Sequence, residues 1–377
     1  MVDFTYKFNN YDKDIPIERK DFLNPKKCVF YVKDGDTIYV ENNQEVVVDQ
    51  LLVIKSNGVK YHSSISGIVT IQGNSVIVTN DNKDTNNDSE NGVLALGNIT
   101  KEDIIDTCKK FGINNGINLL ANEFEDTKRV LLVNTIDVEP YTFNNRYLLQ
   151  ENCKNSLEIL DKISTIFGIA CHIVISKYDN NLISIQDLIN SYPRVNLIIL
   201  KEKYPYNNSL FIKNKYLSEY SDKEIITLDL LTLHKLYIAL RDKRVVNERL
   251  VTVIFNNPVR YYLVNTYYGV YLEEMIDSFV PPSWGGKSVY LNNFFRKNKC
   301  VNFDNLSMTD NVNTIFVFDD VSELTTKCIK CGKCSDICPV KINPLDKKLD
   351  PSCIRCGLCN YVCPANINLI VRVKNDE

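Results

Sequence analysis

The sequence Cys328-Ile-Lys-Cys-Gly-Lys-Cys-Ser-Asp-Ile-Cys-Pro339 lies near the end of the chain and determines the architecture of its last domain. A second run, Cys353-Ile-Arg-Cys-Gly-Leu-Cys-Asn-Tyr-Val-Cys-Pro364, repeats it with the same spacing. Each run places three cysteines at every third position, a fourth cysteine four residues later, and then a proline. Eight of the 13 cysteines lie in these two runs. The doubled pattern indicates two equivalent sets of thiolate ligands.

The spacing Cys-x2-Cys-x2-Cys-x3-Cys-Pro is that of bacterial ferredoxins with two [4Fe-4S] clusters. Three thiolates on a tight loop can bind three irons of one cluster, and Gly332 and Gly357 allow the backbone to turn close to the sulfurs. The fourth cysteine of each run cannot reach the same cluster and therefore ligates the other one. The predicted ligands of one cluster are Cys328, Cys331, Cys334 and Cys363. The predicted ligands of the second are Cys338, Cys353, Cys356 and Cys359.

Structural zinc is the alternative for the tail, because Cys-x2-Cys pairs also form four-cysteine zinc sites. Zinc uses two pairs, whereas each half here offers three cysteines in series, a fourth at a fixed distance and a proline. The pattern therefore favours two [4Fe-4S] clusters. The five remaining cysteines are scattered singly, and we interpret them as small buried hydrophobic residues. They are Cys28, Cys108, Cys153, Cys171 and Cys300.

Composition excludes several classes of protein. A hydrophobic fraction of 44% and a charged fraction of 24% are typical of a soluble globular chain. A net charge of -3 gives no reason to expect binding to nucleic acid. No apolar run approaches the ~20 residues of a membrane-spanning helix. The N-terminus lacks the features of a signal peptide. We expect a cytoplasmic protein, and this leaves open docking at the inner face of a membrane complex.

The chain divides into four predicted segments. Residues 1–80 contain short β-branched runs separated by turn residues, the pattern of a small β-barrel or sandwich. Residues 92–245 alternate strands and helices, which indicates an α/β domain with a parallel sheet. Residues 246–321 return to strand signals around a short helix. The cysteine module occupies residues 322–377.

Local signals define individual elements. Thr100 and Asp103 form a capping-box pattern before a predicted helix, Lys101 to Phe111. Asn144 to Phe167 reads as one long helix or two. Further helices are predicted at Ile185 to Ser191, Leu228 to Leu240 and Leu272 to Phe279. The predicted barrel strands begin at Val29, Thr37, Glu45, Leu51 and Ser75. Later strands are predicted at Arg129 to Asn134, Cys171 to Ser176, Val195 to Leu200, Val251 to Phe255 and Thr314 to Phe318.

Several stretches upstream of the cysteines resemble a known family. They are Asn43-Gln-Glu-Val-Val-Val-Asp-Gln-Leu-Leu-Val, Ser64-Ile-Ser-Gly-Ile-Val, Leu131-Leu-Val-Asn-Thr-Ile-Asp-Val-Glu-Pro-Tyr, Lys203-Tyr-Pro and Glu248-Arg-Leu-Val-Thr-Val. Together with the tail, they are similar to the RnfC family, whose members belong to the Rnf electron-transport complex. That family is related to the NADH-binding flavoprotein of respiratory complex I.

The resemblance implies a fold and a set of cofactors. It implies a lipoyl-like β barrel-sandwich at 1–80, a flavin-type α/β domain at 92–245, a β-grasp domain of the soluble-ligand-binding type at 246–321 and a ferredoxin-type domain at 322–377. It also implies FMN, with Glu139 at the family's acidic position in the flavin site. The implied partners are a redox protein or other subunits of an electron-transfer complex.

The sequence departs from the family where the flavin phosphate would bind. The family's glycine-rich loop GLGGAxFPT is replaced by Phe111-Gly-Ile-Asn-Asn-Gly-Ile-Asn-Leu-Leu, in which only two glycines remain, Gly112 and Gly116. The family's Asn-Val-Gly-Thr stretch reads Asp229-Leu-Leu-Thr, and its GGP turn reads Leu291-Asn-Asn-Phe. A phosphate cradle needs close backbone approach, which bulky side chains prevent. We therefore do not expect NADH oxidation by this chain alone.

Three functions follow from these observations. The leading hypothesis is an electron carrier that relays single electrons through two clusters. The second is an oxidoreductase in which FMN takes a hydride from NADH and passes single electrons to the clusters. The third is an interaction protein whose clusters only stabilise the tail. The glycine-loop departures favour the first hypothesis over the second.

Other candidate sites carry less information. Trp284-Gly-Gly-Lys-Ser resembles the end of a P-loop, but the first glycine of that motif is replaced by Pro281. The three histidines are isolated from one another, and a metal or triad role is not expected for them. They are His62, His172 and His234.

Overall fold

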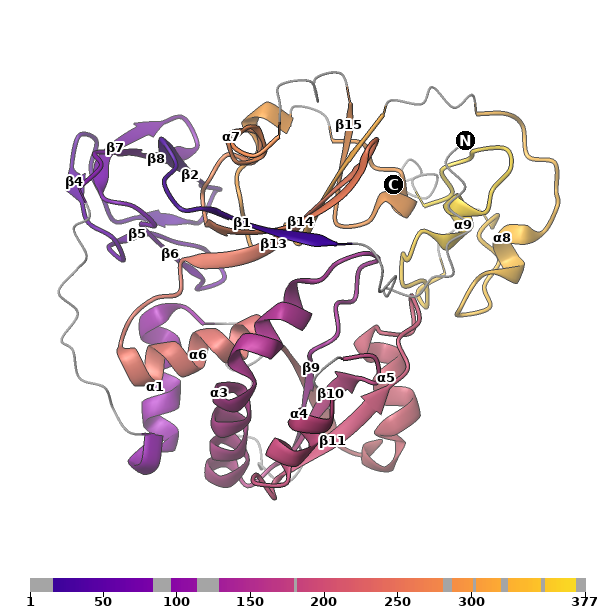
Figure 1. Cartoon of the computed structure of the whole chain (residues 1–377), viewed down its shortest axis with the longest axis horizontal. Helices are drawn as coiled ribbons and strands as arrows, with labels where there is room; N and C mark the ends of the chain where they lie inside the picture. Colours follow the sequence, from indigo (N-terminus) through magenta and orange to yellow (C-terminus); the bar gives the residue numbers. More distant parts are fainter. Residues whose placement is uncertain are drawn as a thin grey trace.

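The structure is a computed structural model of the 377-residue chain. It describes residues 16–83, 96–113, 129–179, 182–280, 287–300, 303–319, 325–346 and 350–370. Figure 1 shows an upper layer of β-structure, a lower layer of helices around a sheet, and a small C-terminal body to one side. In these ranges, no helix has the length and apolar character needed to cross a membrane. The mixed α/β class with several sheets, one of them parallel, confirms the sequence prediction.

The N-terminal β-structure consists of two small antiparallel sheets. One has the order β2 (Lys27–Tyr31), β8 (Ser75–Asn80), β7 (Gly67–Gln72) and β4 (Glu45–Val46). The other contains β3 (Thr37–Ile38), β5 (Leu51–Ile54) and β6 (Lys60–His62). Alternate residues of both sheets point into one apolar core. All five strands predicted in this region are present.

A five-stranded sheet forms the rest of the upper layer. Its order is β1 (Ile17–Phe22), β14 (Val259–Tyr267), β13 (Glu248–Asn256), β16 (Thr314–Phe318) and β15 (Ser288–Leu291). Helix α7 (Leu272–Asp277) packs into the same core as the two small sheets. The strand β1 lies parallel to β14, so the first predicted segment is not self-contained. Residues 17–22 belong structurally with residues 246–321.

The lower layer is a parallel sheet covered by helices. Its order is β11 (Val195–Leu200), β10 (Ala170–Ser176), β9 (Arg129–Asn134) and β12 (Glu224–Asp229). One face packs against α1 (Lys101–Phe111), α3 (Asn144–Phe167), α4 (Leu182–Ile189) and α6 (Leu230–Asp242). The other face packs against α5 (Ser209–Tyr216). This arrangement matches the prediction of an α/β segment.

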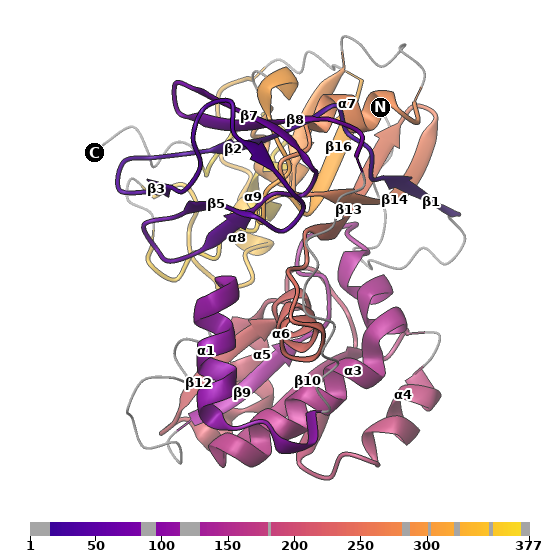
Figure 2. The same cartoon turned by 90° about the vertical axis from the view of Figure 1, so that its left-hand side faces the viewer.

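Local sequence explains the helix ends. Thr100 accepts a hydrogen bond from the backbone N–H of Asp103, whose carboxylate in turn accepts from the backbone N–H of Thr100. The predicted capping box is therefore confirmed. Asn152 has non-helical backbone angles inside α3, so the stretch predicted as one helix or two consists of two helical segments joined at a kink. Gly112 ends α1 with a positive φ and lies against the backbone of Lys60, so this helix end abuts the strand β6 (Figure 2).

Three of the five scattered cysteines are completely or almost completely buried, namely Cys28, Cys108 and Cys171. Burial raises the pKa of each of these thiols, to about 12 for Cys108 and Cys171. The other two, Cys153 and Cys300, are partly buried. These environments agree with the interpretation of all five as small hydrophobic residues rather than ligands.

A charged cluster connects the two layers. The ammonium group of Lys235 on α6 lies 3.2 Å from a carboxylate oxygen of Asp310, in the upper layer. The hydroxyl of Tyr268 donates to the same oxygen at 2.8 Å. Lys235 also stacks over the Tyr268 ring, at 4.6 Å from its centroid. The position of the parallel sheet below the β-layer therefore depends partly on a carboxylate whose side chain is 40% exposed.

We expect the substitution Asp310→Asn to lower the free energy of unfolding by about 1 kcal/mol, because it leaves the Lys235 ammonium without its counter-charge at a site that solvent partly screens. The midpoint of thermal unfolding measures this effect. Asp106→Asn is the control, since Asp106 is an exposed carboxylate on α1. Equal midpoints for the two variants would contradict a bridging role for Asp310.

Candidate metal centre

The two halves of the cysteine domain have the same backbone path. The helix α8 (Lys333–Asp336) follows Gly332, and α9 (Leu358–Tyr361) follows Gly357. Positive φ angles recur at equivalent positions: Lys330 and Arg355, Gly332 and Gly357, Lys341 and Asn366. Each loop therefore curls around the position of its three cysteines and then enters a single helical turn. The repeat seen in the sequence is a repeat of structure.

The side-chain hydrogen bonds inside each half also correspond to those inside the other half. In the first half the hydroxyl of Ser335 donates to the amide oxygen of Asn343 at 3.1 Å. At the equivalent places in the second half, the amide of Asn360 donates to Asn368 at 2.8 Å. The Asn360 oxygen also accepts from the backbone N–H of Leu369 at 2.7 Å. Each half thus ties its helical turn to the segment that follows the Cys-Pro pair.

The fourth cysteine of each run lies beside the other run. Burial raises the pKa of the Cys356 thiol, and the neighbouring Cys338 and Cys353 raise it further. Cys334 packs in one small apolar cluster with Ala365, Ile367 and Leu369, and both Cys359 and Cys363 of the second run pack against this cluster. The two runs therefore pack against each other, so that cysteines of both runs can contribute to one ligand set.

The donor set fits an iron–sulfur cluster. Eight thiols lie on two loops with apolar side chains behind them, and soft thiolate ligands suit such clusters. In the described part of the tail, no three His, Cys, Asp or Glu side chains converge on one point that could hold a single ion. The four ligands of a cubane each bind a different iron, so they need not converge in this way.

The two runs differ in exposure. Cys328 and Cys331 are exposed, whereas Cys334 and Cys338 are buried. The four cysteines of the second run are partly buried. The backbone N–H of Lys330 points at the Cys328 sulfur, 3.4 Å away. The first loop therefore reaches the surface of the molecule, and the second lies against the rest of the chain.

The second loop is docked on a short helix of the upper layer, η5 (Phe294–Arg296). A Cβ at Gly357 would lie 2.7 Å from the carbonyl carbon of Phe295, so the two backbones are in close contact. The amides of Asn360 and Asn368 both donate to the Arg296 carbonyl at 3.2 Å. The Arg296 guanidinium in turn donates to the carbonyl of Arg355 at 2.9 Å.

A polar network continues from this contact into the body. The amide nitrogen of Asn293 lies 2.9 Å from Glu139, 2.7 Å from the Tyr204 hydroxyl and 3.2 Å from the Cys356 carbonyl. The Tyr204 hydroxyl itself donates to the Cys356 carbonyl. Arg296 forms an ion pair with Glu139 at 2.9 Å. Glu139, predicted as a flavin-site residue, therefore holds groups that contact the cysteine domain.

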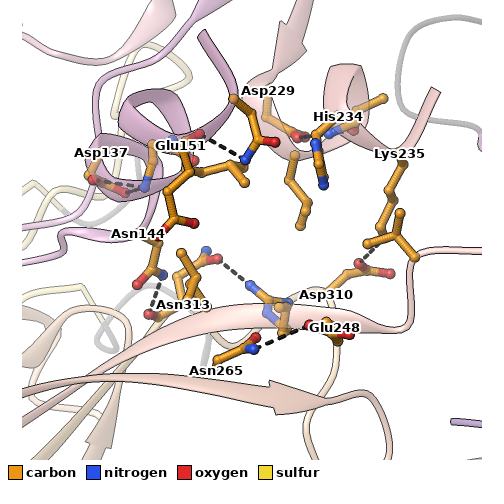
Figure 3. Close-up of a pocket in the computed structure, with 18 of the residues that line it drawn as sticks. Asp137, Asn144, Glu151, Asp229, His234, Lys235, Glu248, Asn265, Asp310 and Asn313 are labelled. Carbon is orange, nitrogen blue, oxygen red and sulfur yellow. Dashed lines mark hydrogen bonds and ion pairs between the residues drawn. The ribbon is translucent and has the colours of Figure 1, made fainter. Parts of the chain in front are cut away.

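A cavity of about 420 Å³ opens at the carboxyl edge of the parallel sheet. Asp137 and Glu139 follow β9, and Asp229 ends β12; Glu248 and Asn265 line the opposite wall (Figure 3). From β9 the chain proceeds to β10 and β11 on one side, whereas β12 lies on the other. Open α/β sheets bind ligands at such a switch point. Glu139 belongs both to this pocket and to the network described above.

The pocket does not present a phosphate site at the start of α6. Asp229 caps this helix: its carboxylate accepts from the backbone N–H of Thr232 at 2.7 Å and from its hydroxyl at 3.1 Å. The N–H groups that bind anions at a helix start thus already face a negative charge. Gly112 contacts Lys60 rather than an open space. The other predicted loop glycine, Gly116, lies outside the described residues, as does the Trp284 stretch.

Three residues of the site cannot be identified from the sequence. In the sequence, Tyr204 is only part of a family landmark, Asn293 is only a departure from a glycine turn, and no pattern marks Arg296. Their roles depend on contacts between segments far apart in the chain. An alignment showing these positions varying together with the second cysteine run is the signal that could find them.

The three histidines lie in different parts of the structure. Of the three, His234 alone lines the pocket. Burial lowers the pKa of each imidazole.

Comparison with known proteins gives three findings. A family model described as a 4Fe-4S binding domain matches residues 324–342. The chain is similar to the C subunit of the ion-translocating oxidoreductase complex of Buchnera aphidicola subsp. Acyrthosiphon pisum (strain APS), 23% identical over 369 residues, 85% of this chain and 74% of that protein. An NAD+-reducing [NiFe]-hydrogenase, solved air-oxidised and H2-reduced, aligns with TM-scores of 0.41 and 0.40, at 16% and 15% identity. These matches cover 53% and 54% of this chain, and 42% of the hydrogenase chain.

We expect Gly357→Ala to release the cysteine domain from the body, because the new methyl group would overlap the Phe295 backbone. Hydrogen exchange of the backbone amides at residues 294–297 should rise by roughly tenfold or more, which corresponds to ~1.4 kcal/mol.

Gly332→Ala is the matched control for this substitution. Gly332 has a similar positive φ, but no heavy atom lies within 4 Å of a Cβ built there. Both variants therefore carry the same kind of backbone strain, but only Gly357→Ala also overlaps with the Phe295 backbone. The same exchange rates at residues 294–297 in both variants would mean that the Gly357 contact does not hold the domain.

Proposed function

We propose that this chain is an RnfC-like electron-transfer subunit of a redox complex, and that it relays single electrons through two [4Fe-4S] clusters. The observation that carries the proposal is the repeated cysteine run on two loops with the same backbone path, which pack against each other: Cys338 lies near Cys356, and Cys359 and Cys363 pack against the apolar cluster that contains Cys334. The similarity along 85% of the chain and the 4Fe-4S family match support it. We assign a lipoyl-like barrel-sandwich to β2–β8, a flavin-domain-like fold to residues 92–245 and a β-grasp-like fold to the five-stranded sheet.

The proposed ligand sets are the crossed ones. Cys328, Cys331, Cys334 and Cys363 hold the cluster nearer the surface. Cys338, Cys353, Cys356 and Cys359 hold the cluster nearer the body. Bound clusters supply one-electron redox chemistry. The chain's own contribution is to bury the second set against η5 and to direct backbone N–H groups at sulfur, as Lys330 does toward Cys328.

The pocket fits poorly with a bound flavin phosphate. The Asp229 carboxylate occupies the helix start where a phosphate would bind, and Gly112 is used for packing. Carboxylates also outnumber cationic groups in the walls. The carboxylates are Asp137, Glu139, Glu151, Asp229, Glu248 and Asp310, and the cations are Arg19, Lys235, Arg244 and Arg249. We therefore propose an electron-relay protein rather than an NADH oxidoreductase acting alone.

One observation favours the FMN-dependent alternative. The pocket lies at the switch point of the parallel sheet and shares Glu139 with the network that reaches the Cys356 carbonyl. A redox-active molecule held there would lie close to the second ligand set.

The partners that we propose are other subunits of a redox complex, with the chain on the cytoplasmic face of a membrane. A purely structural role for the clusters is the third alternative.

Iron and acid-releasable flavin, measured on protein purified without oxygen, test these proposals together. We expect about eight irons per chain and no stoichiometric flavin. Stoichiometric FMN would contradict our interpretation of Asp229 and favour the oxidoreductase. About one or two metal ions per chain, present as zinc, would contradict the cluster assignment.

The crossed ligand sets predict the effect of single cysteine substitutions. We expect both Cys331→Ala and Cys363→Ala to lower the iron content to about four per chain, because both residues belong to the same set. The double variant should retain the same iron content as either single variant. If it instead lost all iron, the two residues would hold different clusters, and the crossed assignment would be wrong. Cys300→Ala, outside both sets, should retain all the iron.

A further inference from the structure

The two halves of the cysteine domain have an equivalent surface, and in the second half this surface contacts the rest of the chain. In the second half this face consists of Gly357, Leu358 and Asn366. Leu358 is buried against Tyr204 and Phe295, and Asn366 contacts the Lys297 side chain. The face is therefore the surface by which the second half binds the body.

The equivalent face of the first half is open and basic. Lys333 stands where the second half has Leu358, and Lys341 stands where it has Asn366. Both lysines are exposed, and a Cβ at Gly332 would meet no atom of the described residues within 4 Å. A surface that binds protein in one copy of the repeat is thus uncovered, by the part of the chain that the structure describes, in the other copy.

Positive charge gathers around this open face. The exposed lysines are Lys327, Lys330, Lys333 and Lys341. Their ammonium groups form no ion pair or hydrogen bond with any residue that the structure describes. The acidic residues among residues 325–346 are Asp336 and Asp346. The segment is thus net positive in a chain whose net charge is -3.

An apolar side chain and two thiols lie on the same loop as three of these lysines. Ile329 is 66% exposed, and its neighbours Cys328 and Cys331 are exposed as well. An exposed aliphatic residue between cations is typical of a small docking site: the charges steer the partner, and the apolar group is covered on contact.

We propose that Lys327, Lys330, Lys333 and Lys341, together with Ile329, form the docking surface for an acidic redox protein that exchanges electrons at the first cysteine run. This rests on the proposed electron-transfer function. The internal precedent is the second run, whose equivalent face binds protein through close backbone contact at Gly357. An anionic membrane surface is the competing occupant. Three of the lysines alternate with the proposed ligand thiols along one exposed loop, which favours a partner that must come close to those thiols.

The test uses the full chain, purified without oxygen, and a small acidic two-iron ferredoxin as the probe. Binding is measured at ionic strengths of about 0.01 M and about 1 M, where the Debye length falls from roughly 30 Å to roughly 3 Å. We expect clear binding at low ionic strength and loss of binding at high ionic strength. A basic cytochrome c should bind more weakly than the ferredoxin at low ionic strength.

The deciding variant is Lys327→Glu/Lys333→Glu, which reverses two charges of the surface without replacing a ligand. We expect it to weaken ferredoxin binding at least roughly tenfold at low ionic strength. The matched control is Lys33→Glu/Lys109→Glu, which changes net charge equally. Lys33 and Lys109 are exposed on the barrel and on α1, two elements on the side of the molecule away from the cysteine domain (Figure 1). We expect the control to bind within about twofold of the unmodified chain.

Other results would overturn the proposal. Equal weakening in both double variants would mean that only net charge matters. Binding to vesicles that contain phosphatidylserine, lost in Lys327→Glu/Lys333→Glu, together with no ferredoxin binding, would assign the surface to a membrane. Iron content and the cluster absorbance are recorded for every preparation. A preparation without clusters would contradict the proposed electron-transfer function. Ferredoxin binding measured on the same preparation would still test the docking surface separately.

Discussion

The close contact between the second cysteine loop and the helix η5 is the interaction on which the site depends. Gly357 brings its backbone against Phe295, and Asn360 donates to the Arg296 carbonyl. A larger residue at position 357 would separate the two segments. This contact fixes the second half of the repeated unit. Packing around Cys334, Ala365 and Ile367 then holds the first half against the second. One docked loop thus positions eight thiols.

The same contact joins the tail to the carboxyl edge of the parallel sheet. Glu139 follows β9 and pairs with Arg296, and Asn293 bridges Glu139 to the Cys356 carbonyl. A buried or half-buried carboxylate is stable here because a guanidinium and an amide both donate to it. The pocket thus shares Glu139 with the network that reaches Cys356, whereas Cys328 and Cys331 in the other half of the cysteine domain are exposed. In the electron relay that we propose, electrons would pass between the body and the exposed lysine-rich face.

Local signals can be predicted from the sequence, and contacts between distant segments cannot. The capping box of Thr100 and Asp103 depends on neighbouring residues alone, and the predicted helix is present. The strand β12 is not evident from the sequence because its apolar residues run directly into those of α6, with Asp229 as strand end and helix cap at once. The pairing of β1 with β14 joins residues far apart in the chain, and no local pattern encodes it. Likewise, the two cysteine runs and their spacing are evident, whereas the docking residues Tyr204, Asn293 and Arg296 are not.

We propose that two clusters lie side by side on one repeated scaffold, and a reductive titration of the anaerobic protein, followed by electron paramagnetic resonance, can test this. We expect the chain to take up two electrons and the fully reduced spectrum to show magnetic interaction between two [4Fe-4S] centres. In the variant Cys331→Ala, the uptake should fall to one electron and the interaction should vanish. Uptake of a single electron by the unmodified chain, or two centres without interaction, would mean that the two clusters do not lie side by side.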